Sequence, residues 1–283
     1  MLTRSCTTKP GREIPMRIDK TEIEKRALEE RATTQTYGIK DIFSLVTQKD
    51  IHLIRYPFGR DKLLGFSTFF EGKKVIVSNS SEILSREIFT IAHELGHVIY
   101  DFEDEFPTVK IDVEIEDSAV DISEARAFYF ANCFLMPEEE LRKYVKFELK
   151  KTHQEINALD VVRMQLEFQV SYSALVVRLY DVGIINLVHK SQLFDKRNEV
   201  TSKALFKQLD ADERLLKSTD VIEVPPSYLE YVTSNYYNKN IPYSSLERAL
   251  AIIGMDASIF NSEETEEPDR EFDLDDIFEE FNE

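Results

Sequence analysis

The sequence of 283 residues has few cysteines, few cations relative to acids, and no long apolar run. Its two cysteines, Cys6 and Cys133, lie far apart and make no disulfide framework, which favours the reducing cytoplasm. No stretch is apolar enough over sufficient length to span a bilayer, and the first residues lack the apolar core of a secretory signal. We therefore expect a cytoplasmic protein without a membrane partner.

Cationic residues are scarce, because 35 Lys and Arg stand against 53 Asp and Glu, for a net charge of −18. Much of this excess lies in residues 261–283, where twelve acidic residues accompany Arg270 alone, a charge of −11 that leaves −7 for the rest. Contacts to nucleic-acid phosphates need clustered Lys and Arg. The balance therefore argues against direct nucleic-acid binding and favours a basic protein partner.

Histidine is also rare, with five residues, yet two of them fall in the run His93-Glu94-Leu95-Gly96-His97. Apolar residues recur at helical spacing from Ile88 to Ile99, which predicts that the motif lies on a buried helix. Positions four apart share a helix face, and two imidazoles there can bind one Zn²⁺ at about 2.0–2.1 Å. Glu94 would then accept a proton from the activated water. The alternative is a buried helix that happens to carry two histidines.

A second helix is predicted over residues 119–136 and ends at Pro137. Its small and apolar face contains one carboxylate, Glu124, which is costly to bury unless it is paired or metal-bound. A catalytic zinc has three protein ligands and an open position, and two histidines with one glutamate form such a set, so Glu124 is the third candidate ligand. The alternative is a glutamate stabilised by the helix dipole. Cys133 is interpreted as a small core residue. The other histidines are interpreted as packed or exposed side chains: His52, His153 and His189.

Three segments ahead of the motif are predicted β-strands, residues 51–56, 64–70 and 74–78, and the last two form a hairpin. We expect a two- or three-stranded antiparallel sheet that leads into the His93 helix. Residues 75–79 are the candidate edge strand, which would hold an extended substrate by β-augmentation through Val75, Val77 and Asn79. A strand that merely closes the core is the alternative. Residues 101–118 are acidic and irregular and are predicted to form a surface loop.

These segments resemble the ImmA/IrrE family of bacterial and phage metallopeptidases. Residues 89–97, Phe-Thr-Ile-Ala-His-Glu-Leu-Gly-His, are very like the family signature, and residues 124–137 are similar to its third-ligand helix with the closing Leu-Met-Pro. Phe128 departs from the family pattern, because Asn is common there. The likeness covers roughly residues 20–255. It implies limited proteolysis of a helix-turn-helix repressor, which derepresses phage, mobile-element or stress genes.

The expected fold class is α+β, a zincin-like peptidase core with a small antiparallel sheet and the motif helix, followed by an all-helical extension. We predict a flexible arm over residues 1–18, in which Met16 could be the true start, a peptidase domain over 19–150, a helical extension over 151–255 and an acidic tail over 256–283. Residues 204–221 are expected to form a polar linker with a short helix. The tail is interpreted as disordered, or as a short acidic amphipathic helix.

Residues 160–183 are predicted to form a helix, a turn and a second helix. The second of these helices has a single cation, Arg178, so packing is favoured over DNA reading. Three residues are candidate oxyanion donors: Tyr100, Tyr172 and Arg178. The expected function is a zinc-dependent endopeptidase, with a catalytically silent binding module and a DNA-binding regulator as the alternatives.

Overall fold

The computed structural model of the chain describes residues 18–31, 36–60, 62–70, 72–102, 110–112, 122–152 and 155–260. The chain divides into two compact units, Met1–Glu223 and Val224–Glu283. The domain boundaries at residues 150 and 255 stay predictions. Met16, His153 and the proposed amphipathic part of the tail lie outside the described residues.

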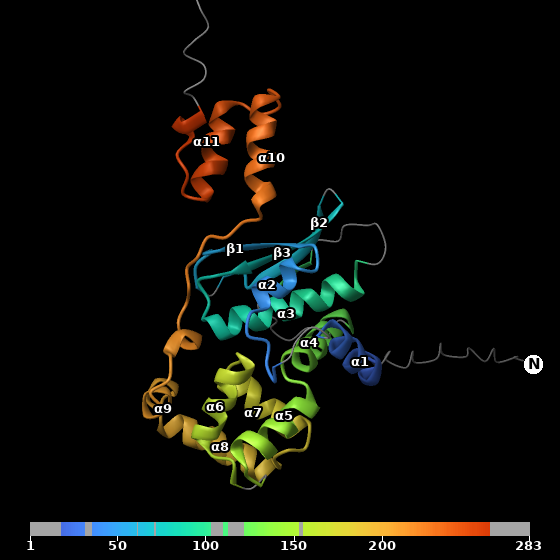
Figure 1. Cartoon of the computed structure of the whole chain (residues 1–283), viewed down its shortest axis with the longest axis vertical. Coiled ribbons are helices and arrows are strands. Elements are labelled where there is room, and N and C mark those ends of the chain that lie inside the picture. The colour runs from blue at the N-terminus through green and yellow to red at the C-terminus, as the bar shows by residue number, and fades with distance from the viewer. Residues whose placement is uncertain are drawn as a thin grey trace, which may run out of the picture. The chain divides into compact units, whose positions relative to one another are not determined.

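The first unit is α+β, as predicted, with a four-stranded sheet against one long helix and further helices beyond it (Figure 1). The strands are β1 (Ile51–Tyr56), β2 (Gly65–Phe70), β3 (Lys73–Asn79) and β4 (Lys110–Asp112), in the order β1-β3-β2-β4. The helices are α1 (Lys20–Glu30), α2 (Ile42–Thr47), α3 (Leu84–Tyr100), α4 (Ile122–Leu135), α5 (Glu138–Tyr144), α6 (Ala158–Phe168), α7 (Tyr172–Asp181), α8 (Leu187–Glu199) and α9 (Ser202–Gln208), with a π-helical turn at Val145–Leu149 and a 3₁₀ turn at Glu213–Leu216.

The sheet is mixed, which corrects the expectation of an antiparallel one. β2 pairs with β3 and with β4 in antiparallel fashion, but β1 pairs with β3 in parallel. β3 has an unbroken run of buried residues from Val75 to Asn79, whereas burial alternates along β1. A strand buried on both faces is stabilised best at the centre of a sheet. The chain therefore crosses from β1 to β2 and places β3 between them. The predicted loop over residues 101–118 also contains a strand, β4.

A buried ion pair fixes the start of α3 to the sheet. Arg55 of β1 donates from Nε and Nη2 to the two carboxylate oxygens of Glu87 in α3, at 2.8 and 2.9 Å, and the Ser78 hydroxyl donates to the same carboxylate at 3.0 Å. The segment after α9 returns to this point, where Glu223 forms an antiparallel bridge with Arg55. Because Arg55 and Glu87 satisfy each other by a bidentate pair, the charges are tolerated in the core.

The helices of the first unit that follow α4 share one hydrophobic core with α3 rather than forming a core of their own. Phe168 of α6 and Leu179 of α7 belong to the same buried cluster as Ile91 and Leu95 of α3. The prediction that residues 204–221 form a polar linker is wrong, because this segment contributes to the core: Leu205 and Phe206 of α9 and Leu215 are buried. The hydrophobic core of the first unit therefore includes residues beyond position 150.

The second unit is a helical hairpin of α10 (Pro226–Tyr237) and α11 (Tyr243–Ile252), followed by a 3₁₀ turn at Ala257–Phe260. Gly254 follows α11 with a φ of +70°, the left-handed conformation expected at a helix end. Its small cluster buries Leu246, Leu250 and Ala257. Among the described residues of either unit, we find no helix with the length and apolar character needed to cross a bilayer.

Candidate metal centre

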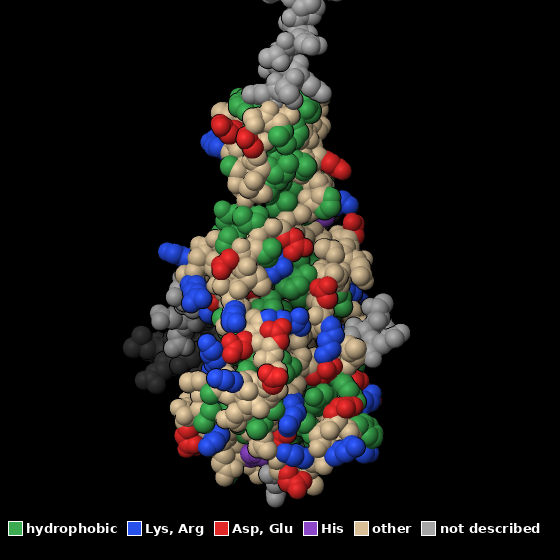
Figure 2. Space-filling view, turned by 60° about the vertical axis from the view of Figure 1, so that its left-hand side comes forward, with side chains coloured by type: hydrophobic (Ala, Val, Ile, Leu, Met, Phe, Trp, Pro, Cys, Tyr) green, Lys and Arg blue, Asp and Glu red, His purple; other side chains and the backbone are tan. Residues whose placement is uncertain are grey.

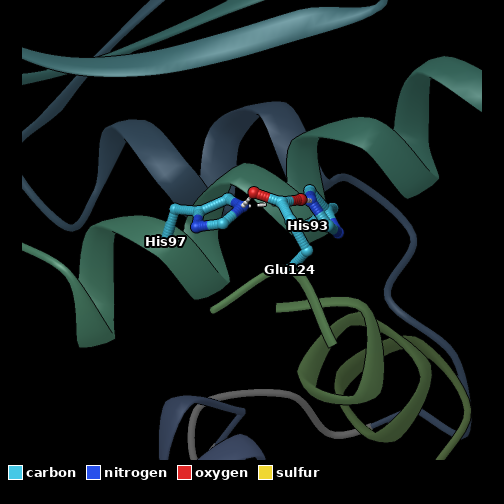
Figure 3. A group of neighbouring side chains, drawn as sticks. All are labelled: His93, His97 and Glu124. Carbon is cyan, nitrogen blue, oxygen red and sulfur yellow. Dashed lines mark hydrogen bonds and ion pairs between the residues drawn. The ribbon is translucent and has the colours of Figure 1, made fainter. Parts of the chain in front are cut away.

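Three side chains from two helices converge on one point (Figure 3). His93 and His97 lie one turn apart on α3, and Glu124 lies in the first turn of α4. The two imidazole Nε2 atoms are 3.1 Å apart, and the carboxylate of Glu124 approaches His93 Nε2 at 3.2 Å and His97 Nε2 at 3.3 Å. The carboxylate thus lies across both rings, and the sequence-predicted set of three is brought together.

The close packing of α3 against α4 makes this convergence possible. Gly96 lies between the two histidines, and a Cβ added there would come within 3.0 Å of the Cα of Ala127 and 3.2 Å of the Phe130 ring. Any larger residue at position 96 would therefore push α4 away. Because Glu124 is one turn before Ala127, the glycine sets how near its carboxylate comes to the imidazoles.

Asp101 orients one of the imidazoles. Its carboxylate lies 2.6 Å from His97 Nδ1 and also accepts hydrogen bonds from Ser123 and Arg126 of α4. Because an ionised carboxylate only accepts, Nδ1 donates to it, which leaves Nε2, the atom that faces His93 and Glu124, as the nitrogen that can bind a metal. Asp101 is not among the site residues predicted from the sequence. Its position four residues after His97, on the same helix face, was the available signal.

The donor set fits a divalent metal ion of the zinc type. Two imidazole nitrogens and a carboxylate oxygen are ligands that zinc takes, and ligands about 2.0–2.1 Å from a tetrahedral centre lie roughly 3.3 Å from one another. The two nitrogens are 3.1 Å apart, and each lies 3.2–3.3 Å from a different oxygen of the Glu124 carboxylate, which is close to that spacing. Lone pairs brought this close also repel unless a proton or a cation lies among them. His93 and His97 are buried, whereas the Glu124 side chain is 20% exposed, so the site is reached from one side.

Glu94 lies next to His93 on α3 and is 1% exposed. Strand β2 passes over this part of α3, because a Cβ added to Gly65 would lie 2.6 Å from Thr90 Cγ2 and 3.7 Å from Glu94 Cγ. Only a residue without a side chain lets β2 approach α3 so closely. The sheet thus covers the stem of Glu94, the residue that follows His93 in α3.

The prediction that β3 is an edge strand is wrong, because β3 lies between β1 and β2. Substrate binding at its three named residues stays a prediction. Val75 and Val77 pair with strands on both sides and are buried. The Asn79 side chain is also fully used: its amide nitrogen donates to the carbonyls of Gly59 and Leu63, and its oxygen accepts from the backbone of Phe58 and Ser81. Asn79 therefore fixes the loop between β1 and β2, which is a structural role.

The three oxyanion candidates bind other partners. Tyr100 donates to Glu22 of α1 at 3.4 Å, and Tyr172 donates to the Leu193 carbonyl at 3.0 Å. Arg178 contacts the Met136 carbonyl at the far end of α4. With a rise of about 1.5 Å per residue, that end lies about 18 Å along the helix from Glu124. Neither Tyr172 nor Arg178 is placed at the cluster by these contacts.

The helix pair α6 and α7 has the predicted turn, but α7 does not present a basic face. Arg178 is its one cation and is 5% exposed, whereas the exposed residues of α7 are Val177, Tyr180 and Asp181. On the face shown in Figure 2, described basic and acidic side chains of the first unit are interspersed. The exposed residues of α7 therefore include no lysine or arginine to contact base edges or phosphates.

His52 and His189 stay apart from the cluster, as expected. His52 lies in β1, and the Nε2 of His189 is 2.7 Å from the carbonyl oxygen of Ile156. Cys133 is buried in the core at 3% exposure, and burial raises the pKa of its thiol. Phe128, the departure from the family pattern, is 57% exposed, and its ring centre lies 5.4 Å from that of Phe89 with the ring planes tilted by 59°.

A comparison with protein families matches residues 35–180 to the family Peptidase_M78, described as the IrrE N-terminal-like domain. The matched range runs from before β1 to the end of α7 and contains both helices of the candidate site. A comparison with curated proteins gave no match.

Proposed function

The chain belongs to the IrrE N-terminal-like family of metal-dependent peptidases, and on that premise we propose that it is a zinc-dependent endopeptidase that makes a limited cut in a protein substrate. The observation that carries the proposal is the convergence of His93, His97 and Glu124 within 3.3 Å, beside the buried carboxylate of Glu94.

In this proposal His93, His97 and Glu124 hold the zinc ion, which when bound polarises the scissile carbonyl and lowers the pKa of water to about 7. Asp101 holds the His97 ring in the tautomer that presents Nε2. Glu94 accepts a proton from the attacking water and returns it to the leaving amine. Strand β2 limits the movement of Glu94, so that its carboxylate stays beside the reacting groups.

The proposed substrate is a basic helix-turn-helix transcriptional repressor, whose cleavage would derepress genes. Two features support this choice. The motifs of the chain resemble those of the repressor-cleaving ImmA/IrrE family, and the chain has a net charge of −18, which attracts a basic partner. The zinc, the repressor and the cytoplasmic setting are parts of the proposal. A DNA-reading role is not favoured, because the one cation of α7 is buried.

The test uses Glu94→Gln, which keeps the size of the side chain but removes its basicity. We expect this variant to bind as much zinc as the wild type and to leave a purified helix-turn-helix repressor from the same genome intact, as followed by intact-mass spectrometry. Cleavage by the variant at the wild-type rate would refute the role of Glu94. A wild type that binds zinc and the repressor but leaves it uncut would instead identify a binding module.

A further inference from the structure

A cavity of about 750 Å³ lies on the side of α4 that faces α1 and α7, and a second cavity of about 380 Å³ lies toward α5. Arg178 of α7 is in the wall of both. The helices involved lie together in the lower part of the first unit in Figure 1. The larger cavity has the volume of a typical small-molecule site, which is about 300–1,000 Å³.

Arg178 is buried without an acidic partner. It is 5% exposed, and its Nε donates to the Met136 carbonyl at 3.1 Å while Nη2 lies 3.5 Å from the sulfur of Cys133. No acid among the described residues forms an ion pair with it, and none of them hydrogen-bonds to Nη1. Its third contact is the Tyr129 ring, whose centre lies 5.9 Å from the guanidinium carbon, so the partners that these contacts give Arg178 are all neutral.

A purely structural role accounts for only part of this arrangement. The bond to Met136 caps the end of α4, as cationic side chains often do. Arg31 serves the same helix end, because its guanidinium donates to the carbonyls of Phe134 and Tyr37. Arg31 is in the wall of neither cavity, however. Arg178 therefore differs in directing a charged group with spare hydrogen-bonding capacity toward open space.

The rest of the larger cavity combines a second cation with apolar surface. Lys20 is exposed at the rim, where its Nζ lies 4.9 Å from the centre of the Tyr129 ring. Ile184 and Ile185 supply buried apolar walls. Of the lining acids, Glu24 already accepts from the Tyr129 hydroxyl, Glu138 pairs with Arg142 at 2.8 Å, and Asp181 is exposed.

We propose that this cavity binds a small organic carboxylate. The carboxylate pairs with the guanidinium of Arg178, and the apolar part of the ligand lies against Ile184 and Ile185. A carboxylate is the group whose geometry matches the planar donors of arginine. The site is separate from the metal centre, because the Met136 carbonyl that Arg178 binds lies about 18 Å along the axis of α4 from Glu124. It does not depend on the proposed peptidase activity.

The test is isothermal titration calorimetry of the full chain with matched pairs of probes. Benzoate and N-acetyl-leucine carry the carboxylate, whereas benzamide and N-acetyl-leucinamide have the same apolar body without the charge. We expect at least one acid to bind at least about tenfold more tightly than its amide, as a charge-assisted bond requires. Because carboxylates also bind metals, each titration is repeated after chelator treatment, and the affinity should not change.

Two variants place the binding at the cavity. Arg178→Lys keeps the charge but loses the planar fork, and we expect at least about tenfold weaker binding of the acid. Lys20→Glu reverses an exposed charge at the rim without touching the core, and we expect roughly three- to tenfold weaker binding. Lys25→Glu makes the same charge change on the exposed face of α1, outside both cavities, and should alter the affinity less than about twofold. Circular dichroism confirms that each variant is folded.

Four results would overturn the proposal: no acid binds at millimolar concentration, the amides bind as tightly as the acids, chelation removes the binding, or Lys20→Glu and Lys25→Glu have equal effects. Loss of binding on chelation would place the carboxylate at the metal centre. Selective loss in Arg178→Lys and Lys20→Glu, with an unchanged response in Lys25→Glu and after chelation, would establish the site.

Discussion

The spacing between α3 and α4 is set at Gly96, and replacing this glycine by alanine tests how closely the candidate site depends on it. Helix propensity alone would make Gly96→Ala stabilising by about 0.8–1.0 kcal/mol. The structure predicts the opposite, because the new methyl group would lie 3.0 Å from the Cα of Ala127, 3.3 Å from its Cβ and 3.2 Å from the Phe130 ring.

Ordinary carbon contacts are about 3.5–4.0 Å, so α4 must retreat by roughly 0.5 Å. Two of the three contacts are to Ala127, which has no side-chain rotamer that could relieve them. Overpacking of this kind costs about 1–3 kcal/mol, which outweighs the gain in propensity. We therefore expect the free energy of unfolding to fall by up to about 2 kcal/mol.

The same displacement reaches the candidate ligands. Glu124 moves with α4, and a shift of roughly 0.5 Å exceeds the tolerance of about 0.2 Å for metal–ligand distances. Zinc affinity, measured by competition with a chromogenic chelator, should fall at least about tenfold, and urea denaturation gives the stability. The double variant with Ala127→Gly removes one of the contacts and should recover part of both losses. If Gly96→Ala is more stable than the wild type and binds zinc equally well, the close packing described here is incorrect.

Three further predictions concern residues around the site and the core. Asp101→Asn should weaken zinc binding by about 10- to 100-fold in the same chelator competition, because the amide no longer fixes the His97 tautomer. Ser123→Ala removes only a neighbouring hydrogen bond to Asp101 and should have a smaller effect. Equal effects of the two variants would contradict the orienting role of Asp101. Asn79→Ala should lower the free energy of unfolding by about 2–4 kcal/mol, because four backbone groups, bonded to Asn79 in one buried and three partly buried hydrogen bonds, lose their partner. Zinc affinity should be unchanged, and a selective loss of substrate binding would instead support a role in recognition. Burial raises the pKa of Tyr172 to about 12 from 10.0, so its neutral form stabilises the fold fully below pH 10, and this stability is lost as the pH rises toward 12. The free energy of unfolding of Tyr172→Phe should therefore depend less on pH over that interval than that of the wild type. Identical pH profiles of the two proteins would refute this prediction.

The features that were predicted best from the sequence are those that depend on the chemistry of neighbouring residues. The helix with His93 and His97 and the helix with Glu124 follow from apolar periodicity and from the cost of a lone carboxylate on an apolar face. Gln169 and Ser171 also fall where the turn between α6 and α7 was expected. These features depend on neighbours within one or two turns of a helix.

The predictions that were wrong concern features that depend on contacts between residues far apart in the sequence. Whether β3 is an edge or a central strand depends on where β1 lies, and the parallel pairing of β1 with β3 is a long-range choice that alternation does not encode. Residues 204–221 are mostly polar in sequence, yet this segment packs against the core through three buried side chains, those of Leu205, Phe206 and Leu215. The role of Asn79 likewise depends on a loop some twenty residues earlier, where Phe58 and Gly59 lie.

The most direct test of the proposed metal centre is the zinc content of the wild type and of Glu124→Ala, purified side by side and measured by elemental analysis. The arrangement of His93, His97 and Glu124 predicts about one zinc per chain in the wild type and a greatly reduced content in the variant. A wild type that holds no zinc even after zinc is supplied would contradict the peptidase proposal. Undiminished zinc in Glu124→Ala would show that the third ligand is a different residue.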